Sequence, residues 1–583
     1  MRGPPREKDN EEIKKGASNR AFDYSIIFGN NADAGRATSP PPKEIGDSKK
    51  LGNPSAPDPP AYATATQRRR IFLRSAAIVG ASVFLSRVLG FLREWAIAHQ
   101  VGSNAITDAY YAAFTLPDIL NYLLAGGALS VTFLPVFLEY FTSDREEEGW
   151  HVFSIVLSAM TVVLLVLLVV AEIYAPVLTH WIAPGFTAEQ HRLLTYLTRI
   201  MLPAQAFFFI GGVLSAVQYA QGRFLIPSLA PLVYNGLIIA FGILLSSRWG
   251  IQSFSWGVLA GSLLGNCLLQ IYGVMRLSAR FRFSLQVRHL GFRRFARLSL
   301  PIMLGFSFIF VDDWVIRWCG SFLAPASITW LGYGKTLMRV VVGIFGMAAG
   351  VASFPILVRL AAEKKWPEMK EGLEEALRHV ILATLPVSVL MAILSRQIIF
   401  LLFSHTRLGL HDMEQTALAM AIFLLGTIAW GGQTILGRGF YALGDTLTPT
   451  LIGTGLALAW LPVYWWLAQQ FQHVGLAAAS SLGILVYAAI LLGVLFRRLQ
   501  ISGAALGLFV LRTAGATALA GGITLYARQL LEAQTNWQTM TGSFVQAATL
   551  SVLFLASFAL FASLTGVAPW RELRAAFARK GER

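Results

Sequence analysis

The chain reads VVLLVLLVVA at residues 162–171, and the sequence stays apolar on both sides of this run. Comparable apolar blocks of roughly 20 to 30 residues recur along the chain, and about 20 helical residues are enough to cross the hydrocarbon core of a bilayer. Of the 583 residues, 55% are hydrophobic and 14% are charged, whereas about 25% of an average soluble domain is charged. The sequence therefore predicts an all-α integral membrane protein.

These blocks predict about fourteen transmembrane helices of about 20 residues each. Their centres lie near residues 84, 122, 166, 205, 236, 263, 308, 344, 386, 427, 458, 486, 517 and 554. Basic residues collect in alternate loops and in the C-terminal tail, at Arg276, Arg280, Arg282, Arg288, Arg293, Arg294, Arg297, Arg359, Lys364, Lys365, Lys370, Arg497, Arg498, Arg571, Arg574, Arg579 and Lys580. Because basic loops face the cytoplasm, both termini are expected there. This bias accounts for the net charge of +16, so no nucleic-acid partner is expected.

The chain divides into segments of different composition. Residues 1–69 are rich in proline, glycine and charged side chains, which predicts a disordered cytoplasmic tail. We expect a first lobe of six helices at 70–280, a basic cytoplasmic linker at 281–295 and a second lobe of six helices at 296–500. Two further helices follow at 501–568, and a basic cytoplasmic tail occupies 569–583.

An internal repeat indicates that the two lobes are related. Residues 219–229 (YAQGRFLIPSL) and 441–451 (YALGDTLTPTL) are identical at six of eleven positions, at an offset of 222. Residues 126–135 and 346–355 also match, at an offset of 220. The offset spans an even number of predicted helices, so both copies have the same orientation in the membrane. Transporters built from such parallel repeats hold their substrate between the halves, near the midplane.

Three ionisable residues, Arg87, Arg93 and Glu94, lie within the first predicted helix. A charge there costs at least about 2.5–3.5 kcal/mol, so it usually faces a partner or a cavity. Arg87 and Glu94 are seven residues apart and share a helix face, while Arg93 is turned about 120° away. Two interpretations stay open: an Arg87–Glu94 ion pair with Arg93 reaching the interface, or a charged face that lines a cavity.

The second predicted helix carries Asp108 and, beside Pro117, Asp118. Asp108 either caps the N-terminus of its own helix, where a carboxylate suits the helix dipole, or lines the cavity. Asp118 is a candidate to line a stretch of backbone that the proline opens.

The seventh and eighth predicted helices hold five more charges. Asp313 and Arg317 are spaced i,i+4, which predicts a salt bridge within one helix, and Asp312 is then left for a proton, a cation or Lys335. Lys335 and Arg339 share a face with no acid between them, and like charges at this spacing repel. Either Asp312 or an anionic substrate should meet them. If a substrate does, a phosphate or diphosphate is the natural ligand.

Motifs of catalysis and metal binding are missing from the sequence. It contains neither a GxxxxGK[ST] phosphate loop nor an HExxH zinc motif. Cys267 and Cys319 lie far apart in apolar segments, as expected of core residues. We therefore expect a transporter, with no enzymatic activity, no cofactor and no metal site.

Two stretches resemble a known family. Residues 86–94 (SRVLGFLRE) and 107–118 (TDAYYAAFTLPD) are similar to the signature of the MurJ (MviN) family. Its members are bacterial lipid II flippases of the multidrug/oligosaccharidyl-lipid/polysaccharide exporter superfamily. Residues 127–130 (GALS), 133–135 (FLP) and 183–186 (APGF) agree with it, and the resemblance covers residues 70–570 approximately.

The resemblance implies a function and a mechanism. The cargo would be undecaprenyl-diphosphate-linked disaccharide pentapeptide, moved from the inner to the outer leaflet of the bacterial cytoplasmic (inner) membrane for peptidoglycan synthesis. Alternating access would be driven by the membrane potential or an ion gradient, and residues 501–568 would form a groove for the lipid tail. Arg87, Arg93 and Asp108 match family residues that line the central cavity. We expect a monomer in the bilayer, with cell-wall synthesis proteins as candidate partners.

The sequence also departs from the family. A family arginine in the second helix corresponds to Asn121, an acidic residue after it to Gly126, and an arginine of the eighth helix to Thr336. The candidate substrate-binding residues are therefore Arg87, Arg93, Asp108, Asn121, Lys335 and Arg339, with Glu94, Asp118, Asp312, Asp313 and Arg317 as candidate charge partners. The alternative cargo is another polyprenyl-diphosphate-linked polysaccharide precursor. The alternative from a different class is a membrane glycosyltransferase.

Overall fold

The computed structural model describes residues 65–125, 132–143, 145–277, 279–304 and 308–567, and every regular element in these ranges is a helix. The predicted all-α class is confirmed for this part of the chain. Helix α2 (Ala65–Gln100) begins within the stretch assigned to the N-terminal tail. The rest of that tail, the C-terminal tail and the start of the second repeat match at residues 126–131 lie outside the described residues.

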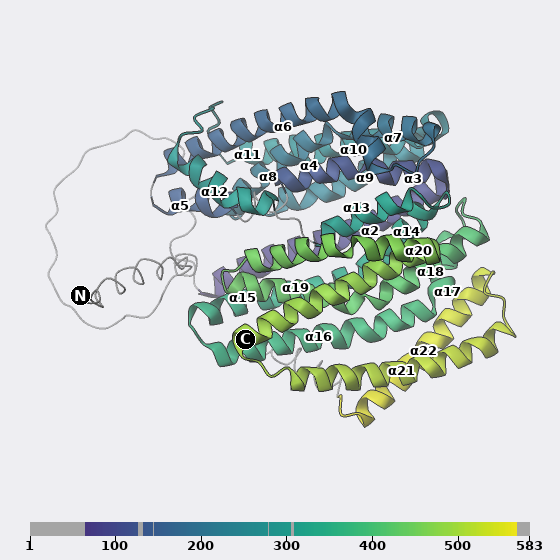
Figure 1. Cartoon of the computed structure of the whole chain (residues 1–583). Coiled ribbons are helices and arrows are strands. Elements are labelled where there is room, and N and C mark those ends of the chain that lie inside the picture. Colours follow the sequence, from purple (N-terminus) through teal and green to yellow (C-terminus); the bar gives the residue numbers. More distant parts are fainter. Residues whose placement is uncertain (1–64, 126–131, 144, 278, 305–307, 568–583) are drawn as a thin grey trace, which may run out of the picture.

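Most helices belong to two bundles that lie side by side (Figure 1). The N-terminal bundle contains α3 (Ala105–Ala113), α4 (Thr115–Ala125), α5 (Leu134–Thr142), α6 (Glu146–Ile182), α7 (Ala188–Met201), α8 (Ala204–Ala220), α9 (Leu225–Trp249), α10 (Gln252–Gly261), the π-helix η3 (Ser262–Leu268) and α11 (Leu269–Met275). The C-terminal bundle contains α13 (Phe308–Gly320), α14 (Ser327–Val341), the π-helix η4 (Val342–Met347), α15 (Ala348–Ala362), α16 (Trp366–Ile393), α17 (Ser395–Phe403), α18 (Leu410–Leu425), α19 (Thr427–Ala442) and α20 (Leu447–Leu499). Helices α21 (Ala504–Glu532) and α22 (Met540–Leu564) pack against its α16 and α17.

The described residues include eight helical stretches that are long and apolar enough to cross a membrane, or nine if the bent pair α18–α19 counts as one span. All the predicted span centres fall inside helices. Several predicted spans are broken into shorter pieces, as where α14, η4 and α15 follow one another. The structure thus describes a multi-pass membrane protein, and the number fourteen stays a prediction.

Backbone turns recur at the offset of the sequence repeat. Gly222 follows α8 with a φ of 69°, and Gly444 follows α19 with a φ of 74°. Gly250 ends α9 with φ 57° and ψ −139°, and Gln472 inside α20 has φ 54° and ψ −138°. The members of each pair are 222 residues apart in the numbering. The same chain geometry therefore occurs in both bundles.

Helix α20 is two helices that fold back on each other at Gln472. The Trp460 indole donates to the Ala479 carbonyl at 2.9 Å, and the Tyr487 hydroxyl donates to the Pro449 carbonyl at 3.1 Å. Residues before and after Gln472 thus lie side by side, as in an antiparallel hairpin. Helices α9 and α10 form the corresponding hairpin of the N-terminal bundle.

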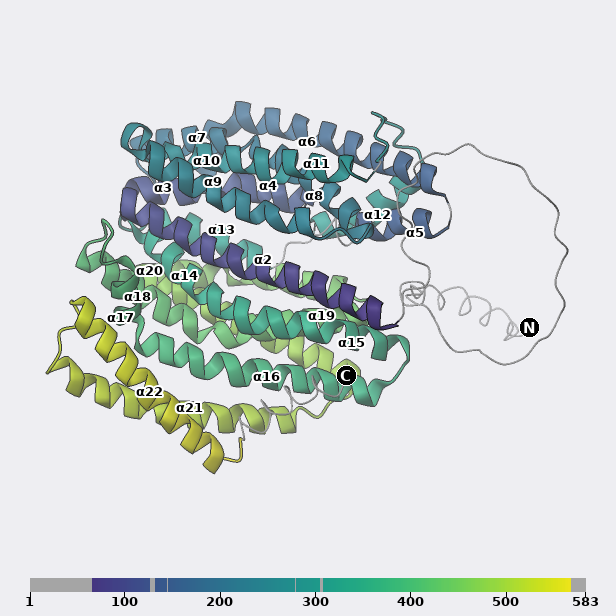
Figure 2. The same ribbon diagram turned by 180° about the vertical axis from the view of Figure 1, so that it is seen from behind.

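Two elements lie along the seam between the bundles. Helix α2 runs along it between the bundles, packing against α9 and also contacting α14 and α17 (Figure 2). The seventh predicted span bridges it, because α12 (Leu290–Leu304) packs on α4, α5 and α6, whereas α13 packs on α20. Apolar side chains fill the interior of each bundle, with Phe209 in the N-terminal core and Phe423 in the C-terminal core, and a smaller apolar cluster joins Ile328 of α14 to α3, α7 and α10. The seam is where the ionisable side chains gather.

Candidate functional site

The centre of the site is a cluster of two cations and two carboxylates on α13 and α14. Lys335, which is only 4% exposed, donates to Asp312 and to an oxygen of Asp313 at 2.6 Å. Arg339 lies one turn further along and donates to both oxygens of Asp313, at 2.8 and 2.6 Å. The two basic residues on one face of α14 are therefore met by protein acids.

Asp312 is held from three directions. Besides Lys335, the Tyr464 hydroxyl and the Ser480 hydroxyl of α20 donate to it, the latter at 2.9 Å. A buried carboxylate is stable only when it is paired and hydrogen-bonded, and Asp312 meets both conditions. Of the three partners that we considered for Asp312, the structure places Lys335 against it.

The predicted salt bridge between Asp313 and Arg317 is wrong. Arg317 instead donates to Asp118 at 2.9 Å and to the Thr115 hydroxyl at 3.2 Å, both on α4. Asp313 turns toward Lys335 and Arg339 because two cations stabilise it better than one. The Arg317–Asp118 pair joins α13 to α4 and so connects the two bundles. Asn121 lies one turn beyond Asp118 on α4 and is half-buried.

The charges of α2 also pair differently from expectation. Glu94 binds Arg93 at 2.6 Å and accepts a hydrogen bond from the Tyr111 hydroxyl, so the proposed Arg87–Glu94 pair is wrong. Arg93 does not reach the interface either, since its second guanidinium nitrogen donates to Asn235 of α9 at 3.4 Å.

Two arginines lie against glycines of the C-terminal bundle. A methyl group added at Gly343 of η4 would lie 3.6 Å from Nε of Arg87. One added at Gly350 of α15 would lie 2.8 Å from a guanidinium nitrogen of Arg438, and that nitrogen is buried without a hydrogen-bond partner in the described part of the chain. In the sequence, Arg438 is an isolated cation in an apolar helix, and this is the signal by which it could have been predicted as a site residue.

Asp108 lies apart from this group, at the end of the seam where α3 meets α14. Its carboxylate accepts from the backbone N–H of Ala326 at 2.7 Å, from that of Thr329 at 2.8 Å and from the Thr329 hydroxyl at 2.6 Å. The cap of α3 itself is Asn104, so the expectation that Asp108 caps its own helix is wrong. It caps the first turn of α14 and holds the two bundles together.

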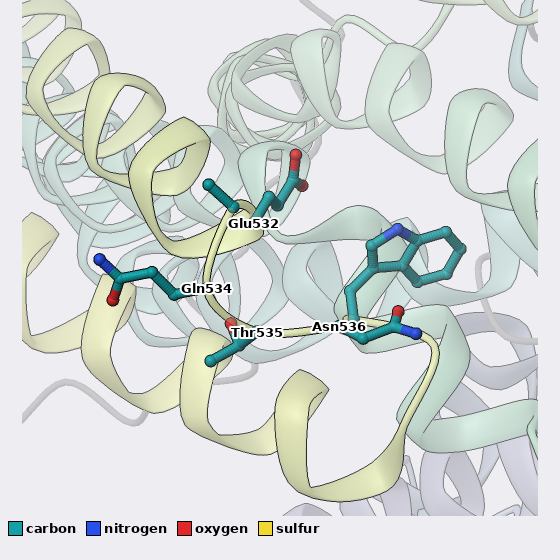
Figure 3. A pocket seen from close by; sticks show the side chains of 6 residues that line it. Glu532, Gln534, Thr535 and Asn536 are labelled. Carbon is teal, nitrogen blue, oxygen red and sulfur yellow. The ribbon is translucent and has the colours of Figure 1, made fainter.

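Two pockets lie away from these charged groups. One of about 470 Å³ is lined by Glu532, Gln534, Thr535 and Asn536 in the turn between α21 and α22 (Figure 3). Another of about 480 Å³ lies between α5, α6 and the start of α12. Neither contains a predicted site residue. Within the described residues, no group of three or more histidine, cysteine or acidic side chains is arranged to hold a metal ion.

The Arg317–Asp118 link can be tested by charge exchange. Arg317→Asp and Asp118→Arg are each expected to destabilise the protein, and the double variant is expected to recover about 1 kcal/mol of coupling free energy. This value is small because the Asp118 side chain is 41% exposed and water screens the pair. A double-mutant cycle on thermal unfolding in detergent measures it. Additive single effects would show that the pair does not couple the bundles.

The sequence profile described as "Lipid II flippase MurJ" matches residues 97–550. The chain belongs to the MurJ family. It is 26% identical over 422 residues to the lipid II flippase MurJ of Burkholderia cenocepacia, covering 70% of this chain and 81% of that one. It is 27% identical to a probable lipid II flippase MurJ of Haemophilus influenzae, covering 70% and 83%.

Solved structures give the same answer for the fold. A structure titled "Lipid II flippase MurJ, inward closed conformation" matches with a TM-score of 0.69 and 21% identity, covering 84% of this chain and 99% of that one. An inward-facing multidrug-resistance MATE transporter of the MOP superfamily matches with a TM-score of 0.57 and 14% identity, covering 73% and 98%. The chain therefore has the transporter fold of the MurJ family, which is a family of flippases rather than of enzymes. A membrane glycosyltransferase is set aside.

Proposed function

We propose that this protein moves lipid II from the inner to the outer leaflet of the bacterial cytoplasmic membrane. Membership of the MurJ family supports this cargo, and the charged layer on the seam supports a strongly anionic one. In that layer five cations (Arg87, Arg93, Arg317, Lys335 and Arg339) lie among four carboxylates (Glu94, Asp118, Asp312 and Asp313). Among the described residues of this layer, basic side chains thus outnumber acidic ones by one.

Lys335 and Arg339 are paired with carboxylates in this structure, so a diphosphate would have to replace one of these partners in order to bind them. Asp312 is fully buried, but the Asp313 side chain is 28% exposed and Arg339 is 41% exposed. We infer that a phosphate group takes the place of Asp313 on Arg339 and Lys335, while Asp312 keeps Lys335 in position. Asp313 would then act as the counter-anion of the empty site.

We further infer that the two bundles are pseudo-symmetric lobes that rock around one closed end. Residues related by the repeat offset of 222 meet there. The Thr329 hydroxyl donates to the Thr107 hydroxyl at 3.0 Å, and the rings of Tyr111 and Tyr333 pack edge to face with centroids 6.0 Å apart. An axis through such contacts relates one bundle to the other. Rocking about this end would open the opposite end of the seam, as alternating access requires.

The remaining features of the proposal come from the family resemblance and the charge pattern. Both termini lie in the cytoplasm, by the positive-inside bias. Helices α21 and α22, beside α16 and α17, form the groove for the lipid tail. The membrane potential or an ion gradient drives the cycle, and a potential of 100 mV supplies about 2.3 kcal/mol per elementary charge.

Depletion and complementation test the function. In bacteria depleted of their own lipid II flippase, the wild-type chain is expected to restore growth and the outer-leaflet pool of lipid II. Arg87→Ala and Arg93→Ala are each expected to lower flipping by about tenfold or more, because a hydrogen bond to a charged group contributes about 1.5–3 kcal/mol. Arg359→Ala is the matched control, since Arg359 is exposed and pairs with Glu363 outside the site.

The outcomes separate the site from the cargo. Full activity of both alanine variants would refute the proposed site. If the chain fails to restore lipid II but restores another polyprenyl-diphosphate-linked glycan, the cargo is that glycan and the site survives.

A further inference from the structure

The segment between α11 and α12 has an unusual surface. From residue 280 to residue 287 it reads RFRFSLQV without helical structure, so apolar and polar side chains alternate. Phe281, Phe283, Leu285 and Val287 are between 48% and 67% exposed. We call residues 280–288 the strap. The bundle covers only about half or less of each of these side chains, although the Phe281 ring also packs edge to face on the buried Phe153, with centroids 6.3 Å apart. Contact of the uncovered apolar surface with water would be unfavourable.

The strap lies along α6 (Figure 1). The backbone N–H of Arg282 donates to the Ser154 hydroxyl at 3.1 Å, and that of Ser284 donates to the Ser158 hydroxyl at 3.2 Å. These bonds fix the position of the strap along the length of α6. The exposed large apolar side chains of α6 begin at Val162, one turn beyond Ser158. The strap is therefore at the edge of the apolar surface that α6 presents to lipid.

The charged residues in the sequence around the strap are all basic. Residues 276–297 contain seven arginines and no acidic residue. Arg282 and Arg288 are exposed. Arg280 lies 2.8 Å from Glu147, and both of these side chains are largely in solvent, so the pair leaves the guanidinium accessible. Basic residues beside a span attract anionic lipids, by about 1 kcal/mol each near the surface.

We propose that the strap is a lipid anchor for the connection between the two bundles. The apolar side chains of the strap enter the boundary between headgroups and acyl chains, and Arg280, Arg282 and Arg288 bind the phosphate groups of anionic phospholipids. Aromatic and apolar side chains interleaved with arginine suit that boundary, because one part of the segment is apolar and the other is charged. The partner is the anionic leaflet itself. This proposal does not depend on the transported cargo.

Depth in the bilayer is the first test. Phe283→Cys is made in a chain that also carries Cys267→Ala and Cys319→Ala, labelled with a small fluorophore and placed in nanodiscs that contain lipids with a quencher high on the acyl chain. Quenching is expected to approach that of a label at Val166, which is a lipid-facing position of α6. Quenching no greater than that of a label at the exposed Gln534 would overturn the proposal.

Lipid selectivity is the second test. Nanodiscs are formed with equal amounts of phosphatidylglycerol and phosphatidylcholine, and the lipids retained by the extracted protein are counted by mass spectrometry. R280Q/R282Q/R288Q is expected to lose the enrichment in phosphatidylglycerol, by up to about fivefold per arginine. The matched control is R192Q/R248Q/R407Q, which removes three exposed arginines outside the strap, one in α7, one at the end of α9 and one just before α18. Equal enrichment in both triple variants would overturn the proposal.

Discussion

Replacing Lys335 by methionine is expected to lower the stability of the protein by about 3–5 kcal/mol and to abolish transport. The reason is that Lys335 and Asp312 are a buried pair, with side chains 5% and 0% exposed. Removing the ammonium leaves the Asp312 carboxylate in the interior with only two hydroxyl donors. Thermal unfolding of the purified protein measures the stability, and complementation measures the transport.

A double variant separates the structural role of Lys335 from its functional one. Asp312→Asn with Lys335→Met removes both charges, and neutral replacements of a buried pair often restore stability. We expect its unfolding temperature to return toward that of the wild type while transport stays lost. Normal transport by the double variant would show that Lys335 does not contact the cargo. Lys365→Met, at an exposed lysine paired with Glu363, is the control for a change of net charge.

The second large effect is expected from Asp108→Asn. The change removes the negative charge from a carboxylate that accepts three hydrogen bonds from the first turn of α14, and it turns an amide N–H toward those donors. A hydrogen bond to a charged group contributes about 1.5–3 kcal/mol. Loss of this amount is expected to shift the equilibrium toward the state with this end open, by roughly 10-fold or more.

Spin labels on the two bundles measure this shift. Cysteines at Ile106 of α3 and Leu410 of α18, both exposed, report the separation at this end. Asp108→Asn is expected to add a population with a longer distance. The matched control is Asp412→Asn, because Asp412 accepts from Trp330 at 3.0 Å and so links α18 to α14 within one bundle. An unchanged distance distribution in Asp108→Asn would mean that this carboxylate does not hold the bundles together.

The side of a helix on which a charged residue lies follows from the sequence, because the helical period is known. The i,i+4 spacing places Lys335 and Arg339 on one face, and the structure has them on the same carboxylate. The sequence did not show which acidic residue each cation pairs with. Asp313 and Arg317 have the same spacing, yet Arg317 pairs with Asp118, 199 residues away. Spacing gives a possible contact within a helix, and a closer partner on a neighbouring helix overrides it.

The same limit applies to Asp108. Its position near a helix start predicts a cap, but Asn104 already supplies the cap of α3. The donors of Asp108 belong to a turn 218 to 221 residues away. Sequence offers a signal in retrospect, because Thr107 and Thr329 are separated by the repeat offset and lie in contact. A repeat offset shows which positions in the two bundles are equivalent. Whether two equivalent residues touch depends on how close they lie to the axis that relates the bundles.

The sequence by itself determined that this chain spans a membrane with helices, that it carries a repeat at an offset of 222 and that ionisable residues occur within its spans. These features depend on composition and helical period, which are local properties. Only the tertiary structure decided which cation meets which carboxylate and that Asp108 joins α3 to α14. The reason is that a poorly solvated charge takes the nearest available counter-charge, and the nearest one is fixed by how the bundles pack along their seam.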